Sequence, residues 1–179
     1  MAITKIQSES LNLADDFAFT GTITGAGGQA TNFFQAVNAG TAATFTHGAS
    51  VLVPFDAENY DPDGVFDPSS GNYKFTCQTS GYHFFTAQVQ QDNTGGNSRQ
   101  VATLLYKNGS NIGNGSGVYW DTYNSDTFGD STIKATAIIN LTAGDYVQVY
   151  FYQTQSDSGS NTLKTSGNYN IFTGYRIAQ

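Results

Sequence analysis

Short runs in which apolar and polar residues alternate dominate the chain from residue 32 to the C-terminus. Side chains alternate across a β-strand, so such runs predict strands with one buried face. Gly, Asn, Asp and Pro separate the runs, and no stretch of useful length has helical periodicity. The expected strands are Asn32–Val37, Ser50–Phe55, Tyr73–Gln78, Gly81–Gln90, Gln100–Lys107, Lys134–Leu141, Asp145–Gln153 and Tyr169–Ile177. This spacing predicts an all-β fold, an antiparallel β-sandwich.

Three of the connections carry the chemistry of tight turns. Asp61–Gly64 reads Asp-Pro-Asp-Gly, and Lys107–Ser110 reads Lys-Asn-Gly-Ser. Proline presets a negative φ, and Gly or Asn supplies a positive one. Ala143–Asp145 is the third expected turn.

The run from residue 145 to 152 shows how the pattern assigns faces. One set of alternate residues is aliphatic or aromatic and is expected in the core: Val147, Val149 and Phe151. The other set is Tyr146, Gln148, Tyr150 and Tyr152. Tyrosine is enriched at interfaces, so this second set predicts a face covered by another subunit. The alternative is a few scattered exposed tyrosines, which are normal on protein surfaces.

Residues 1–30 differ from the rest of the chain and predict an extended N-terminal arm, with the sandwich formed by residues 31–179. Glycines punctuate the arm at positions 21, 25, 27 and 28. Its apolar residues are spaced for short extended pieces: Leu11, Leu13, Phe17 and Phe19. Such a segment buries little by itself, so we expect these four residues to anchor the arm on a neighbouring copy or a larger assembly.

Charge and composition exclude several partners. The 179 residues carry a net charge of −7, which disfavours nucleic acid. Charged residues make up 12% of the chain, against about 25% in an average domain, whereas aromatic residues make up 14%. The N-terminus lacks the apolar stretch of a secretory signal, and no later run is long enough to cross a bilayer. We therefore expect a protein made in a cytoplasm, without membrane insertion.

The inventory of catalytic groups is small. His47 and His83 stand in strand-like sequence outside any spaced metal or nucleophile motif, and the single cysteine, Cys77, is expected to be a small buried side chain. An acidic cluster lies between Asp56 and Asp67, and its Asp-x-Asp-Gly start is that of a calcium loop. Pro68 and the lack of a closing Glu argue against calcium there. We expect neither an enzyme nor a cofactor.

Six local patterns resemble, in order, the trimeric jelly roll shared by the globular head of the first complement component and the tumour necrosis factor ligands. They are Phe33–Val37, Tyr60–Phe66, the Gly-rich pair Gly71–Thr76 and Thr79–Phe85, the apolar strand Leu104–Gly109 ending in Lys-Asn-Gly, the Leu-x-x-Gly-Asp-x-Val of Leu141–Val147, and the Phe-x-Gly-Tyr of Phe172–Ile177. Together they cover almost all of residues 33–179. The resemblance implies a jelly roll that assembles as a homotrimer.

The chain departs from that family at several points. His83 stands where the family usually has Tyr, and Cys77 and Gln78 replace the usual Ala-Pro. There is also no collagen Gly-x-y repeat, the usual trimer stalk of the complement proteins. The missing stalk puts an immune or hormonal role in doubt.

The segment Thr4–Thr22 resembles leader segments of virion proteins of tailed bacteriophages, particularly marine and cyanobacterial ones. The two resemblances together imply a virion structural protein, a trimeric decoration, cement or knob protein whose arm binds other capsid or tail proteins. The alternative is an adhesin at a tail or fibre tip that binds host-surface glycan. A glycan-cleaving enzyme is a third and weaker hypothesis, since it needs two carboxylates about 5–10 Å apart across a groove.

Two loops, residues 108–131 and 155–168, are expected to be exposed and free to contact a host surface. The first contains four aromatic residues that could stack on sugar rings: Tyr119, Trp120, Tyr123 and Phe128. The same four could instead form a local hydrophobic cluster that pins the loop. The sequence leaves both possibilities open.

Overall fold

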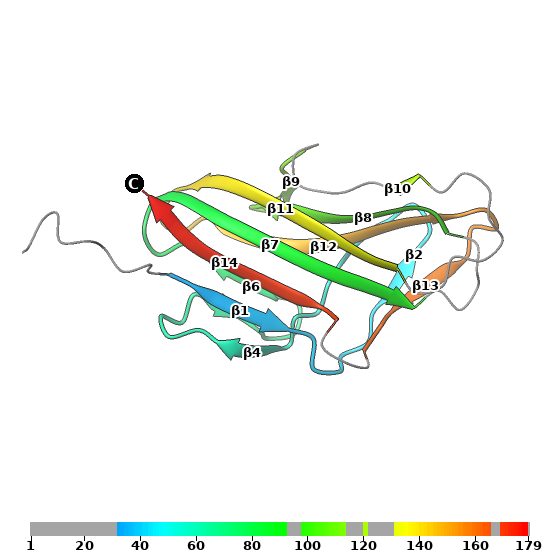
Figure 1. Ribbon diagram of the computed structural model, residues 1–179, viewed down its shortest axis with the longest axis horizontal. Coiled ribbons are helices and arrows are strands. Elements are labelled where there is room, and N and C mark those ends of the chain that lie inside the picture. Colours follow the sequence, from blue (N-terminus) through cyan, green and yellow to red (C-terminus); the bar gives the residue numbers. More distant parts are fainter. Residues whose placement is uncertain (1–31, 93–97, 114–119, 122–130, 166–168, 179) are drawn as a thin grey trace, which may run out of the picture.

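The computed structural model describes residues 32–92, 98–113, 120–121, 131–165 and 169–178. Over these residues the protein is all β, with strands arranged in two facing antiparallel sheets (Figure 1). The predicted fold class, an antiparallel jelly-roll sandwich, is confirmed. No helix in the described part of the chain is long and apolar enough to span a membrane.

Sheet A has seven strands, and its longest ladder joins β7 to β11 over Ser131–Leu141. Across the face shown in Figure 1 the strands follow the order β11, β7, β14, β1, β4, and β13 and β2 extend the sheet from the far end of β7. The bounds are β1 (Phe34–Val37), β2 (Thr44–Thr46), β4 (Ala57–Tyr60), β7 (Gly81–Asp92), β11 (Ser131–Leu141), β13 (Ser160–Leu163) and β14 (Ile171–Ala178). The start of β1 and the end of β14 lie at the same end of the sandwich, here called the arm end because residues 1–31 precede it.

Sheet B also has seven strands and lies behind sheet A in Figure 1. Its centre is β12, which pairs with β8 along one edge and with β6 and β3 along the other. The bounds are β3 (Ser50–Leu52), β5 (Phe66–Asp67), β6 (Lys74–Thr76), β8 (Ser98–Lys107), β9 (Ser110–Asn111), β10 (Trp120–Asp121) and β12 (Tyr146–Gln155).

Phenylalanines from both sheets fill the core at the arm end. Phe34 of β1 stacks on Phe66 at 5.1 Å and on Phe75 at 5.4 Å, and meets the edge of Phe172 at 4.9 Å between ring centroids. Burying each ring contributes about 2–3 kcal/mol, and favourable ring pairs add about 1 kcal/mol each. This cluster joins the two sheets.

The opposite end of the sandwich has a polar interior. Asn161 of β13 donates to Gln91 Oε1 at 3.0 Å and to Ser98 Oγ at 2.8 Å, and it accepts from Gln155 Nε2 at 2.5 Å. Gln153 donates to the carbonyl of Phe45 at 2.8 Å. These amides come from strands of both sheets, so they tie the two layers together where the aromatic core ends. We did not predict this cluster, although Gln153 and Gln155 continue the inward series of Val147, Val149 and Phe151.

All eight predicted strands are present. The sequence missed β2, β4, β5, β9, β10 and β13, which are two to four residues long. Strands this short carry too few alternating positions to reveal a period by themselves, and their pairing depends on the strands beside them. The equally short β1, β3 and β6 were predicted because each lies within a longer alternating run.

The Lys-Asn-Gly-Ser turn is confirmed as the connection between β8 and β9. Asn108 and Gly109 have φ of 51° and 77°, which match a two-residue hairpin turn. Asp145, in the neighbouring connection between β11 and β12, stabilises this turn. Its carboxylate accepts hydrogen bonds from the Asn108 side chain at 2.7 Å, from Lys107 at 2.8 Å and from the Thr142 N–H at 2.8 Å. Hydrogen bonds from Lys107, Thr142 and Asn108 hold the pKa of Asp145 well below its usual range.

Candidate interaction surface

The predicted tyrosine row lies on the outer face of sheet B. Alternation along β12 is as expected, since Val147, Val149 and Phe151 are fully buried between the sheets. The row itself consists of Tyr146, Gln148, Tyr150 and Tyr152.

Contacts within the chain already cover much of this row. Gln148 is buried and donates to the Asn72 carbonyl at 2.6 Å. Tyr150 packs on Tyr106 with 4.1 Å between ring centroids, and burial raises the pKa of Tyr150. All three tyrosines of the row are half-buried. A subunit interface at this row stays a prediction.

The other predicted contact residues lie largely outside the described part of the chain. This holds for Tyr119, Tyr123 and Phe128, and for the arm residues Leu11, Leu13, Phe17 and Phe19. The backbone of Trp120 begins β10 and pairs with Val101. A ligand-contact loop and an arm anchor therefore stay predictions.

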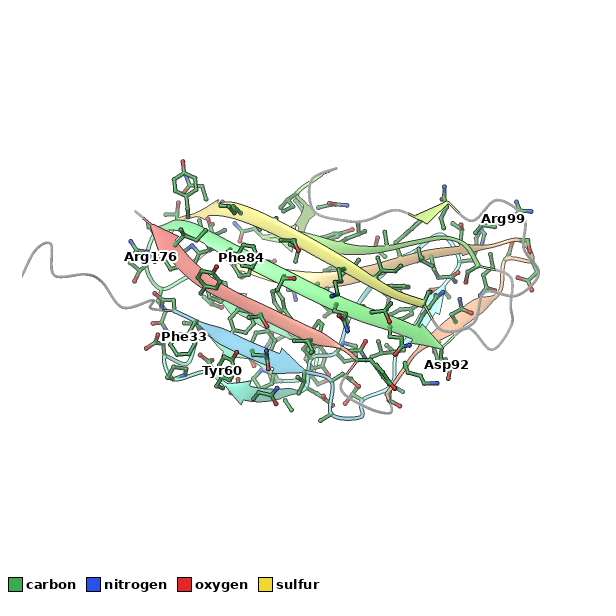
Figure 2. All side chains as sticks on the ribbon, in the orientation of Figure 1. Phe33, Tyr60, Phe84, Asp92, Arg99 and Arg176 are labelled. Atoms are coloured by element: carbon green, nitrogen blue, oxygen red, sulfur yellow. The ribbon has the colours of Figure 1, made fainter. Side chains whose placement is uncertain are left out.

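A row of large apolar side chains crosses the outer face of sheet A near the arm end, and we call it the apolar belt. Ile138 of β11 stands opposite Phe84 of β7, and Phe84 stands opposite Tyr175 of β14. The Phe84 and Tyr175 rings are 5.3 Å apart, and the Phe33 and Tyr60 rings, at β1 and β4, are 5.9 Å apart. Figure 2 shows Phe33, Tyr60 and Phe84 at this end of the sheet.

Most of the large apolar side chains that the described part of the chain leaves exposed lie in or beside the belt. Its exposed fractions are 63% for Ile138, 46% for Tyr60, 39% for Tyr175 and 36% for Phe33. Tyr82 and Ile177 flank it and are about half exposed, at 48% and 49%. Contiguous apolar patches are uncommon on soluble monomers and mark interaction sites.

The next row of the same face is polar but uncharged. Thr136, Thr86 and Thr173 stand opposite one another on β11, β7 and β14, and Gln35 of β1 continues the row. Thr86 and Thr136 lie 3.3 Å apart between hydroxyl oxygens, and Gln35 donates to Thr173 at 3.4 Å. A partner can therefore cover the belt and this row without burying a charge.

Only part of the belt could be predicted from the sequence. Phe84 and Tyr175 fall on the non-core side of their strands by simple alternation. Placing them beside Ile138 requires the pairing of β7 with strands about 50 and 90 residues away, and local pattern does not determine that register.

Cys77, which has the chemistry of a nucleophile, and His83, which has that of a base, are both buried in the arm-end core. The Cys77 sulfur lies 3.9 Å from His83 Nε2, a proximity that the sequence did not reveal. Burial raises the pKa of the Cys77 thiol and lowers the pKa of the His83 imidazole. Both shifts favour the neutral forms, whereas nucleophilic chemistry at cysteine uses the thiolate.

The acidic segment between Asp56 and Asp67 uses its carboxylates to bind backbone N–H groups. Asp61 accepts from Val65 at 3.0 Å and from Phe66 at 2.7 Å, and Asp56 accepts from Ala39 and Thr41. Within the described ranges, no group of three or more His, Cys, Asp or Glu side chains is placed to hold a metal ion. These carboxylates act as local caps.

Comparison with known proteins agrees with this architecture. Among solved structures, the globular domain of a zebrafish complement 1qA protein matches with a TM-score of 0.52 at 14% identity, over 83% of this chain and 99% of that one. Murine APRIL matches with a TM-score of 0.55 at 8% identity, over 81% of this chain and 98% of that one. None of the curated proteins matches the sequence.

The match to a protein family covers most of the sandwich. The family model of the C1q domain aligns with residues 34–177, from the start of β1 to the last residue but one of β14. This chain therefore belongs to the C1q domain family.

Proposed function

We propose that the protein is a homotrimeric, non-catalytic module of a phage virion, a decoration, cement or knob protein held on the particle by its arm. The observation that carries the trimer is the apolar belt, an exposed and uncharged strip across sheet A. Burying such a strip between copies removes apolar area from water at about 25 cal/mol per Å². The resemblance to trimeric jelly rolls supports three copies.

The outer face of sheet A is a better candidate for this contact than the tyrosine row of sheet B. Gln148, at the centre of that row, is already buried by its own chain, whereas Ile138 at the belt is 63% exposed. A new contact at the belt therefore has more apolar surface left to bury.

Two features of residues 1–30 support the virion location. One is the resemblance of Thr4–Thr22 to phage leader segments, and the other is the set of apolar residues expected to anchor the arm: Leu11, Leu13, Phe17 and Phe19. Fixing three modules in one trimer multiplies weak contacts to the particle or to a host without any new contact chemistry.

Light scattering of the purified full-length chain tests the trimer. We expect the mass of three chains for the wild type and of one chain for Ile138→Asp, because a carboxylate buried in an apolar contact is strongly unfavourable. Circular dichroism should show the same β content in both. A wild type that stays monomeric at the highest soluble concentration would contradict the proposal.

Binding of the purified protein to virus particles tests whether the arm attaches the module. Virions that lack the protein should bind the wild-type trimer but not the variant Leu11→Ser with Phe17→Ser, whose mass should remain that of the trimer. Equal capture of both proteins would show that these two side chains do not attach the module.

The alternative function, an adhesin for host-surface glycan, predicts a different binding partner. Its candidate contacts are Tyr119, Trp120, Tyr123 and Phe128. An adhesin should bind isolated host envelope and lose that binding when these four residues become Ala. A cement protein should instead detach with loss of capsid stability.

A further inference from the structure

The Lys-Asn-Gly-Ser turn contains a pair of residues that is prone to a spontaneous reaction. In an Asn-Gly pair the backbone nitrogen of glycine can attack the side-chain amide carbon of asparagine, because glycine has no side chain that hinders the approach. The chain has two such pairs, Asn108–Gly109 and Asn114–Gly115, and a serine follows each. Asn108 and Gly109 are exposed, so water reaches them and burial does not protect them.

The reaction is a deamidation, and water is its only co-reactant. A bond forms between Gly109 N and Asn108 Cγ, and the bond from Cγ to Nδ2 breaks. The leaving nitrogen takes the proton of the Gly109 N–H and departs as ammonia. Water then opens the cyclic imide to aspartate or isoaspartate. Attack requires the reacting atoms to approach to about 3–3.5 Å in the right orientation, so the freedom of the amide decides the rate.

Both ends of the Asn108 amide are bound in the folded protein. Its Nδ2 donates to Asp145 Oδ1 at 2.7 Å, and its Oδ1 accepts from the Tyr146 N–H at 2.9 Å. The backbone N–H of Asn108 also donates to the Tyr146 carbonyl at 3.0 Å. Departure of Nδ2 as ammonia has to break its bond to Asp145. Closing the imide ring shifts the amide carbon toward Gly109 and strains its bond to Tyr146.

Asp145 is itself fixed and ionised. Lys107 lies 2.8 Å from its carboxylate, and the Thr142 N–H donates to it at 2.8 Å. Because these hydrogen bonds and the one from Asn108 hold the pKa of Asp145 well below its usual range, the carboxylate stays charged at neutral and mildly acidic pH. A hydrogen bond to an ionised acceptor is about twice as strong as one between neutral groups. Asp145 is therefore a persistent partner for the Asn108 amide.

The folded turn also disfavours the product of the reaction. Deamidation replaces the Nδ2 donor by a carboxylate oxygen, at the position that now lies 2.7 Å from Asp145 Oδ1. Two carboxylates at such a separation repel each other. The turn therefore opposes both the departure of the ammonia and the charge that replaces it.

We propose that Asn108 is a deamidation site that Asp145 and Tyr146 keep closed in the folded protein, and that it reacts only when this turn opens. The inference is independent of the proposed trimer and of its location on a particle. It gives Asp145 a role beyond the geometry of the hairpin, which is to preserve the Asn-Gly bond against chemical ageing.

The rate of deamidation in the full-length chain tests the inference. The protein is kept at neutral pH, either folded or unfolded in guanidinium chloride, and fragment mass spectrometry follows the loss of each amide. In the unfolded chain Asn108 and Asn114 should react at similar rates, since both precede Gly-Ser. Folding should slow Asn108 at least about tenfold, because a charge-assisted hydrogen bond has to break first. Equal rates at Asn108 in the folded and unfolded chain would overturn the proposal.

Two variants assign the protection to the carboxylate. Asp145→Ala removes the acceptor and should raise the folded rate at Asn108 about tenfold. Lys107→Met, the matched control, removes another hydrogen bond of Asp145 but leaves the one from Asn108, so it should change the rate less than about twofold. Each folded rate is divided by the rate of the same variant in guanidinium chloride, which removes effects of the neighbouring residues on the reaction itself.

A third variant separates the hydrogen bond from the stability of the fold. Asp145→Asn keeps the side-chain shape and a neutral acceptor, so with unchanged β content by circular dichroism its rate should lie between those of the wild type and Asp145→Ala. Rates at Asn108 that are the same in the wild type and in both Asp145 variants would show that the carboxylate does not protect the bond, and the inference would be wrong.

Discussion

A histidine lies inside the aromatic core at the arm end. His83 is fully buried between Phe75 and Phe85, with ring centroids 5.5 Å and 6.2 Å away, and its Nδ1 lies 3.0 Å from the Gly81 carbonyl. Burial is the main cause that lowers its pKa, and the nearby Arg176 guanidinium acts in the same direction. The core therefore holds an imidazole that resists protonation.

This burial predicts acid sensitivity. Below the ordinary value of 6.5 the unfolded chain takes up a proton on His83 that the folded chain does not, so the free energy of unfolding falls as pH decreases through that value and toward the lowered folded pKa. The loss is at most about 1.4 kcal/mol per pH unit. Urea midpoints measured between pH 7.5 and 5.5 should show this slope in the wild type and not in His83→Gln. The variant His47→Gln retains His83 and should retain the slope; a flat wild-type profile would contradict the prediction.

At the scale of single elements, β14 contributes a glycine between two core rings that its neighbouring strands in sheet A carry, Phe34 of β1 and Phe85 of β7. A Cβ built at Gly174 would lie 2.5 Å from a ring carbon of Phe85 and 2.8 Å from one of Phe34. Both rings are fully buried and packed on other rings, so neither can move aside freely. Glycine here makes room for the core.

The substitution Gly174→Ala should therefore destabilise the sandwich. Overpacking of a filled core typically costs about 1–3 kcal/mol, and we expect the upper part of this range because two rings are displaced. Thermal unfolding of Gly174→Ala and of the neighbouring outward-facing Thr173→Ala provides the comparison. A midpoint for Gly174→Ala equal to that of Thr173→Ala would show that the rings adjust without cost.

The amide cluster at the other end links elements of both sheets. Asn161 of β13 is its centre and is fully buried, with hydrogen bonds to Gln91, Ser98 and Gln155. Removing it leaves buried polar groups unsatisfied, which costs more than the hydrogen bonds themselves contribute.

Asn161→Ala should lower the free energy of unfolding by about 2–4 kcal/mol, because several buried amide groups lose a partner and a cavity remains. Thr162→Ala, next in the strand and exposed, is the control and should cost less than about 0.5 kcal/mol. Chemical denaturation of the two variants measures the difference. Similar losses in both would mean that the cluster contributes little net stability.

At the scale of the whole molecule, the features that could be predicted are those that depend on residues close together in the sequence. The eight predicted strands and the inward series of β12 follow from alternation, and the positive φ of Asn108 follows from its turn. The exposed surface does not follow in this way. Gln148 is buried because the Asn72 carbonyl reaches it from another segment, and Ile138 joins Phe84 only through the register of β11 on β7. Both depend on contacts between residues far apart in sequence, so the sequence alone pointed to the less exposed of the two faces.

The proposed assembly of three chains predicts that the thermal stability of the protein depends on its concentration. If the belt is buried between copies, unfolding separates three chains, and mass action raises the free energy of unfolding as the protein becomes more concentrated. A tenfold rise in concentration adds about 0.9 kcal/mol per chain for a trimer, which corresponds to about 2–4 °C in the midpoint for a domain of this size. Calorimetry of the wild type should show this shift. Ile138→Asp should unfold at the same temperature at every concentration, because its belt no longer takes up a partner. A wild-type midpoint that stays fixed across a hundredfold range of concentration would mean that folding and assembly are independent, and the belt would then have to be covered by something other than another copy of the chain.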